Sequence, residues 1–257
     1  MFKRLRIAVL LYVLLFVAAA QFFTAQQSTD WDAPLWVDIY TVAGDDDETT
    51  RRYLDGLTAT EFEDVEEFLN REAQRFGVEL AQPFSVRIVG EHRDPLPSLD
   101  GNASALDVLW WSLRMRWLAT RLRWRQDGPS GDIMVFAVFH EPSAGVALDR
   151  STALEKGLIA VANVFATRTA RGSNQVVLAH ELLHTLGASD KYVSGSNLPV
   201  FPEGYAAPEA QPLLPQAKAE LMAGRRPIDE TEAETPESLR EVVIGAATAL
   251  EIGWHTL

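Results

Sequence analysis

Two histidines and a glutamate have metal-binding spacing in the stretch VVLAHELLHTLGASDKY, residues 176–192. His180 and His184 are four residues apart, so on a helix both imidazoles project from one face and can reach one metal ion at about 2.0–2.1 Å. Glu181 is turned by one residue from His180 and flanks that ion without having to bind it. The pattern predicts a zinc site in which Glu181 is the general base for a water molecule activated by the metal.

A catalytic zinc site takes three protein ligands, so one more is required. Gly187 follows His184 by three residues and can adopt the left-handed conformation that ends a helix, which turns the chain back toward the metal. Asp190 then lies where one carboxylate oxygen can be the third ligand. We therefore predict zinc ligation by His180, His184 and Asp190, with Glu181 as the catalytic residue.

These residues resemble a known motif. HELLHTLGASD, residues 180–190, is similar to the extended zinc-binding motif of the metzincin metallopeptidases, in the snapalysin-like variant whose third histidine is an aspartate. Metzincins also carry a methionine in a tight turn beneath the zinc, and Met222 in AELMAGRRP matches that Met-turn. The resemblance implies a zinc-dependent metalloendopeptidase that holds a peptide or protein substrate along an edge strand, which we expect near residues 145–149.

The resemblance also implies a fold. It predicts an α+β, metzincin-like zincin fold, with a twisted mixed sheet, an active-site helix, the Met-turn and a C-terminal helix. An N-terminal hydrophobic helix precedes this domain in the predicted organisation.

Two other interpretations stay open. In a gluzincin-type metallopeptidase the third ligand is a glutamate from a later helix, and the candidates are Glu203, Glu209 and Glu220. Alternatively, the chain is a membrane-anchored, zinc-stabilised module that does not catalyse a reaction. The presence of Glu181 argues against this module, because a structural zinc needs no base and usually has four protein ligands.

The first 25 residues have the pattern of a signal peptide or signal anchor. Lys3, Arg4 and Arg6 precede an apolar run over residues 7–20, and acidic residues follow it. The positive-inside rule then places the rest of the chain outside the cytoplasm. We expect a linker over residues 26–34 and a catalytic domain over residues 35–257, either membrane-anchored or secreted if the leader is cleaved.

Composition narrows the chemistry further. The 257 residues carry 36 acidic and 23 basic side chains, a formal charge of -13 that argues against nucleic acid as a partner. The chain has no cysteine, so disulfides and thiolate ligands are excluded and any metal is held by nitrogen and oxygen. With 47% hydrophobic residues, the chain can build a sizeable core.

The elements that must position the site follow the order strand, helix, strands, helix, loop, helix. Hydrophobic periodicity predicts strands over residues 35–44, 83–91, 132–140 and 157–165, and helices over residues 58–77 and 236–254, besides the motif helix. A Pro-rich stretch, residues 194–215, follows the motif and is predicted to be a functional loop.

A Trp-rich helical insertion is predicted over about residues 104–126. Its apolar side chains form two opposite faces, with arginines between them: Leu106, Trp110, Leu113, Trp117 and Trp124 on one, and Val108, Trp111, Met115, Leu118 and Leu122 on the other. A helix that is apolar on two sides is usually buried between layers of its own protein, and this is the interpretation that we favour. The alternative is an interfacial helix that lies on a membrane.

Overall fold

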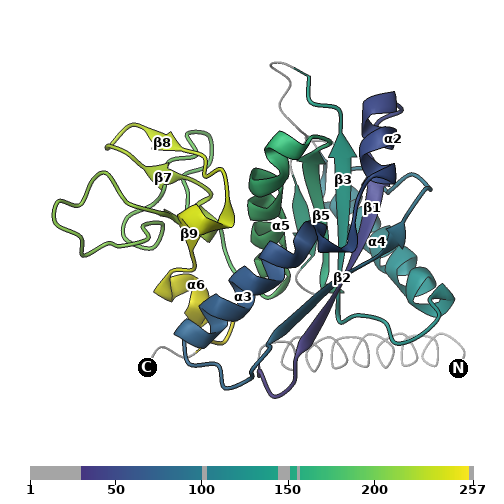
Figure 1. Cartoon of the computed structure of the whole chain (residues 1–257), viewed down its shortest axis with the longest axis horizontal. Coiled ribbons are helices and arrows are strands. Elements are labelled where there is room, and N and C mark those ends of the chain that lie inside the picture. The colour runs from purple at the N-terminus through teal and green to yellow at the C-terminus, as the bar shows by residue number, and fades with distance from the viewer. Residues whose placement is uncertain (1–29, 100–102, 144–150, 155–156, 255–257) are drawn as a thin grey trace, which may run out of the picture.

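The computed structural model describes residues 30–99, 103–143, 151–154 and 157–254 (Figure 1). The leader predicted over residues 1–25 and the edge strand expected near residues 145–149 lie outside these ranges. Within the described residues, no helix combines the length and the hydropathy needed to cross a membrane.

A five-stranded mixed sheet forms the centre of the molecule, with the strand order β2-β1-β3-β5-β4. Four of its strands run parallel: β1 (Leu35–Ala43), β2 (Phe84–Glu91), β3 (Ile133–His140) and β5 (Ile159–Phe165). The edge strand β4 (Thr152–Leu154) runs antiparallel to β5. The α+β class, the mixed sheet and the strands predicted over residues 35–44, 83–91, 132–140 and 157–165 are therefore confirmed.

Both faces of the sheet are covered, which explains the nearly continuous apolar run of β3. Alternate β3 side chains enter two separate cores: Val135 and Phe139 lie in one, and Phe136 and Val138 lie in the other. Helices α3 (Glu63–Arg75) and α5 (Arg171–Thr185) cover the first face, and α4 (Ala105–Arg125) lies on the second (Figure 1). The motif helix α5 is thus packed against the sheet along its length.

The acidic cluster after β1 starts a helix that the sequence analysis missed. Helix α2 (Glu48–Asp55) begins after Asp47, whose side chain accepts a hydrogen bond from the Thr49 N–H at 2.7 Å. An aspartate at this position satisfies a backbone N–H that has no partner within the helix. The same residues also have the composition of a turn, so the sequence pattern predicts a break after the strand and no helix.

The Trp-rich insertion is helical, as predicted, but its expected burial on two sides is wrong. Trp111, Met115 and Leu118 of α4 are buried against the sheet. The opposite apolar face is exposed in the described structure: Leu106, Trp110, Leu113, Trp117 and Trp124. Helical periodicity identifies two apolar faces on this segment, but it does not show whether other parts of the protein cover both faces.

The chain after α5 forms short elements on the side of α5 away from the sheet (Figure 1), where the turns Leu221–Ala223 and Leu239–Glu241 contact α5. They are β6 (Ala219–Glu220), β7 (Arg226–Pro227), β8 (Ala233–Glu234), β9 (Val242–Val243) and α6 (Ala246–Glu251). The helix predicted over residues 236–254 is therefore wrong in its first half. Tertiary pairing replaces it, because Val242 and Val243 pair in parallel with β6 and the Ile244 N–H donates to the Glu72 carboxylate at 3.0 Å.

Candidate metal centre

The end of α5 turns the chain back as predicted. Gly187 has a φ of 99°, in the left-handed region that favours glycine. The Gly187 N–H donates to the His184 carbonyl at 3.2 Å, and the Ala188 N–H donates to the Leu183 carbonyl at 3.1 Å. This pair of bonds is the Schellman helix ending. It brings Asp190 to the histidine face of the helix.

Three side-chain atoms converge beyond this turn. His180 Nε2 lies 3.0 Å from His184 Nε2, and Asp190 Oδ1 lies 3.2 Å from the first nitrogen and 3.1 Å from the second. A tetrahedral ion with bonds of about 2.0–2.1 Å keeps its ligand atoms about 3.3 Å apart. The spacing of the three atoms therefore suits a small ion such as zinc.

The backbone determines which nitrogen of each imidazole faces this point. His180 Nδ1 lies 2.9 Å from the Leu221 carbonyl oxygen, and His184 Nδ1 lies 2.7 Å from the Ala188 carbonyl oxygen. A carbonyl can only accept, so both Nδ1 atoms carry a proton, and each imidazole in its neutral form presents the Nε2 lone pair to this point. Two such lone pairs and a carboxylate oxygen at about 3 Å repel one another unless a proton or a metal ion lies among them. These side chains thus meet the requirements of a metal site.

Electrostatics in the described structure agree with this arrangement. Burial by itself lowers the pKa of His180, but the hydrogen bond with Asp190 and the negative charge of Glu181 outweigh burial and raise that pKa. Burial raises the pKa of Asp190, but hydrogen bonds with His180 and His184 outweigh it and hold the pKa far below its usual range. The cluster therefore favours a positive charge at its centre and keeps Asp190 ionised.

Glu181 is buried beside this cluster. One of its carboxylate oxygens and one ring nitrogen from each of His180 and His184 all lie within 4.8 Å of one another. These residues and Asp190 line one cleft of about 1110 Å³, together with Thr152 and Ala153 of the edge strand and Tyr192. The cleft thus places the acid–base candidate, the candidate metal-binding side chains and the edge strand β4 next to one another.

Met222 lies in a tight turn that supports this cleft. Its side chain is fully buried, and its carbonyl accepts the Lys191 N–H at 2.9 Å. Gly224 ends the turn with a φ of 69°, and the preceding Leu221 carbonyl holds His180. The backbone of the turn therefore contacts His180 and Lys191, while the methionine side chain packs in the core.

Glu220 is buried, but its carboxylate is engaged by the turn and by α6. It accepts hydrogen bonds from the Ala223 N–H at 2.9 Å, the Gly245 N–H at 3.0 Å and the Thr248 hydroxyl at 2.8 Å. Burial raises the pKa of Glu220, although these hydrogen bonds act in the opposite direction. Glu203 and Glu209, the other gluzincin candidates, are exposed.

We expect Glu220→Ala to lower the free energy of unfolding by about 3 kcal/mol, because three donors lose a buried acceptor at about 1–3 kcal/mol each. Urea denaturation followed by circular dichroism measures this change. The matched control is Glu230→Ala at an exposed position, which should stay within about 0.5 kcal/mol of the parent. A Glu220→Ala variant as stable as the control would contradict the assigned structural role.

Glu251 is a site residue that the sequence analysis missed. From α6 its carboxylate accepts the Ser189 N–H at 2.9 Å and contacts the Lys191 ammonium at 2.7 and 2.8 Å. Burial raises the pKa of Glu251, but hydrogen bonds from Lys191 and Ser189 outweigh it and lower that pKa. These contacts hold Ser189 and Lys191, the two chain neighbours of Asp190. Asp190 and Glu251 are 61 positions apart in the sequence, and no short motif links the two residues.

We expect Glu251→Ala to weaken zinc binding about 10- to 100-fold, the range seen when a group that orients a metal ligand is removed. Competition with a fluorescent zinc chelator measures the affinity. Glu241→Ala, in the same C-terminal segment but without a contact to residues 189–191, serves as the control. An unchanged affinity in Glu251→Ala would show that Asp190 is held without this contact.

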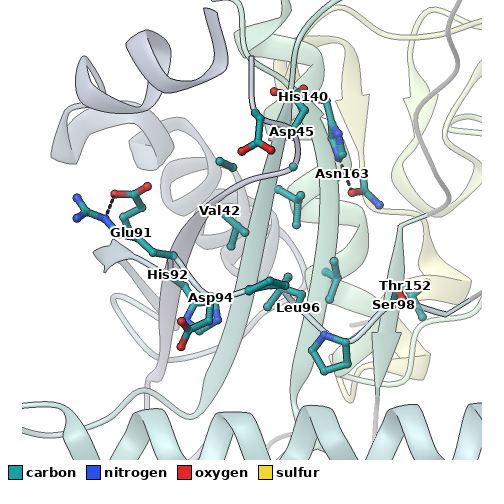
Figure 2. Close-up of a pocket in the computed structure, with 18 of the residues that line it drawn as sticks. Val42, Asp45, Glu91, His92, Asp94, Leu96, Ser98, His140, Thr152 and Asn163 are labelled. Atoms are coloured by element: carbon teal, nitrogen blue, oxygen red, sulfur yellow. Dashed lines mark hydrogen bonds and ion pairs between the residues drawn. The ribbon is translucent and has the colours of Figure 1, made fainter. Parts of the chain in front are cut away.

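A second cavity, of about 780 Å³, lies at the carboxyl ends of β1 and β3 on the face that α4 covers (Figure 2). Asp45, His92 and His140 are among its lining residues. His140 Nε2 lies 3.0 Å from Asn163 Oδ1, and Asp45 accepts the Glu141 N–H at 2.7 Å. These contacts of His140 and Asp45 connect neighbouring strand ends.

Comparison with known proteins adds little to this geometry. No family model and no curated protein matches the sequence. A solved structure described as "Structure of a chaperone-substrate complex" aligns with 86% of this chain at 16% identity and a TM-score of 0.41. The chain spans about a third of that protein's length, since the alignment covers 34% of it. At this TM-score the likeness supports no statement about fold family or function.

Proposed function

We propose that the protein is a zinc-dependent metalloendopeptidase of the metzincin type, in the snapalysin-like variant with an aspartate as third ligand. The observation that carries the proposal is the convergence of His180 Nε2, His184 Nε2 and Asp190 Oδ1 at 3.0–3.2 Å, with both Nδ1 atoms donating to carbonyls. His180, His184 and Asp190 would hold the ion. This leaves room for the open coordination position that catalytic zinc sites keep.

Glu181 has the position required of the acid–base residue. Zinc, when bound, supplies Lewis acidity and lowers the pKa of a coordinated water to about 7. The Glu181 carboxylate would accept the proton of the attacking water and later give it to the leaving amine. Its burial beside the histidines supports this role, because a desolvated carboxylate accepts a proton more readily than an exposed one.

The edge strand β4 supports the choice of a peptide substrate. Thr152 and Ala153 line the same cleft as the histidines, and β4 pairs with β5 on one side only within the described sheet. An extended peptide can pair with such an edge through main-chain hydrogen bonds. We expected this strand near residues 145–149, which are not described, and now propose Thr152–Leu154 for the role.

Other features favour the metzincin type over the alternatives. The Met222 turn lies against His180 through the Leu221 carbonyl, as the family resemblance requires of a Met-turn. The gluzincin alternative is disfavoured because Glu220 is hydrogen-bonded elsewhere, while Asp190 contacts both histidines. A non-catalytic module gives no reason for Glu181 to lie in the cleft. We further propose an exported chain, secreted or anchored by its leader.

Removal of the metal tests the proposal directly. The purified protein should bind about one zinc per chain and cleave a peptide library, and a chelator such as 1,10-phenanthroline should abolish cleavage. Adding zinc back after dialysis should restore it. A protein that binds zinc but cleaves no peptide in the library would favour the non-catalytic module.

A further inference from the structure

The exposed side of α4 is a continuous apolar surface, which we call the outer face of α4. It consists of Leu106, Trp110, Leu113, Trp117 and Trp124. The three tryptophans are 63%, 64% and 86% exposed. Large apolar side chains scattered singly over a surface are ordinary, but a contiguous patch on one helix marks an interaction site. The outer face is separate from the side of α4 that packs on the sheet.

Arginines border the outer face. Helix α4 carries five arginines (Arg114, Arg116, Arg121, Arg123 and Arg125) and one acidic residue, Asp107. Asp107 lies at the first turn and is hydrogen-bonded to Ser104. The Arg121 guanidinium lies 5.4 Å from the centre of the Trp117 ring. This helix is therefore strongly cationic within a chain whose formal charge is -13.

We propose that the outer face of α4 docks on an anionic lipid surface. Tryptophan rings partition to the headgroup level of a bilayer, and arginine side chains extend from an apolar stem to reach lipid phosphates. A helix that has an apolar face of Trp and Leu next to basic residues has the composition of an interfacial helix. Negative charge on the lipid complements the arginines, whereas a second copy of this chain docked through its own α4 would bring like charges together.

The start of β1 lies close to the end of α4. Trp36 is 47% exposed, and its N–H donates to the Asp132 carboxylate at 2.9 Å, while Arg123 of α4 donates to the Asp132 carbonyl at 3.1 Å. Trp36 follows the leader predicted over residues 1–25 by only about ten positions. A leader held in a membrane would therefore keep this end of α4 within reach of the same membrane, because each residue spans at most about 3.6 Å.

The first turns of α4 also reach the metal cleft, from the side of the helix opposite the outer face. Val108, in the first turns of α4, lines that cleft together with His180 and Asp190. The docking proposal does not depend on peptidase activity, so each can fail without the other. Its test therefore uses lipid contact and not turnover as the readout.

Single-cysteine labelling of the full chain tests the contact, because the native sequence contains no cysteine. Leu113→Cys and Trp117→Cys on the outer face and Leu250→Cys on α6 each receive an environment-sensitive fluorophore. Leu250 is 67% exposed on α6, and α6 and α4 lie on opposite sides of the molecule in Figure 1, so Leu250 is a matched control. Vesicles contain either phosphatidylcholine alone or phosphatidylcholine with phosphatidylserine, and some lipids carry a nitroxide quencher near the headgroup.

We expect the labels at 113 and 117 to become blue-shifted and quenched with phosphatidylserine vesicles, and the label at 250 to stay unchanged. Replacing Arg114 and Arg125 with glutamine should lower the docking equilibrium about five-fold for each arginine, and high salt should lower it further. The proposal is overturned if the labels at 113 and 117 behave like that at 250, or respond equally to both vesicle types. Shielding of these labels before vesicles are added would also overturn it, because protein would then cover the face.

Discussion

Replacement of Glu181 by glutamine is expected to reduce kcat/KM for peptide hydrolysis about 10²- to 10⁴-fold while zinc stays bound, since general acid–base catalysis contributes this range. Glutamine keeps the shape of the side chain but cannot accept the proton of the attacking water. His180, His184 and Asp190 are unchanged in this variant, so the side chains assigned to metal binding remain complete. Zinc analysis by native mass spectrometry and a quenched-fluorescence peptide assay measure the two quantities separately.

The matched control is Glu203→Gln, a neutralised glutamate at an exposed position in the loop after the motif. It should retain both zinc and activity. Retained hydrolysis in Glu181→Gln would refute the catalytic assignment. Loss of zinc in the same variant would instead identify Glu181 as a ligand. This alternative is specific, because the Glu181 carboxylate lies close to a ring nitrogen of each histidine.

Replacement of Asp190 by alanine is expected to remove zinc at concentrations that saturate the parent protein. Asp190 Oδ1 contacts both histidine nitrogens, and its carboxylate supplies the negative charge of the ligand set. Loss of a direct ligand should therefore exceed the about 10- to 100-fold loss that follows removal of a group behind a ligand. Chelator competition measures the affinity, and hydrolysis should disappear in parallel.

Glu209→Ala and Glu203→Ala provide the controls, because the gluzincin alternative would assign one of these residues the same role. Both are exposed, and we expect both variants to bind zinc as the parent does. If Asp190→Ala keeps its zinc and one glutamate variant loses it, the third ligand is that glutamate. Thermal melting of each metal-free variant would separate a lost ligand from a lost fold.

Much of the candidate site could be predicted because its geometry is local. His180, Glu181 and His184 lie on one helix, and the helix period alone places the two histidines together. Gly187 was recognisable as the helix end because few other residues adopt a positive φ, and Asp190 follows from that turn. Glu251 could not be found in this way, because its contact with Lys191 depends on how α6 packs.

The fold shows the same division between local and distant information. The run of apolar residues in β3 predicts a buried strand, since every side chain finds a core on one face or the other. Residues 236–245 have helical periodicity but become a turn and β9, because pairing with β6 and the Glu72 carboxylate replace helical hydrogen bonds. The exposed outer face of α4 likewise depends on which parts of the protein cover it.

The most direct test of the central claim is a zinc K-edge X-ray absorption spectrum of the zinc-loaded protein, compared with that of Asp190→Asn. We predict two imidazole ligands with the remaining positions filled by oxygen at about 2.0–2.2 Å, and a change in the oxygen shell when the aspartate is replaced. Three imidazole ligands, or a spectrum that is unchanged in Asp190→Asn, would contradict the assignment of His180, His184 and Asp190 as the metal-binding set.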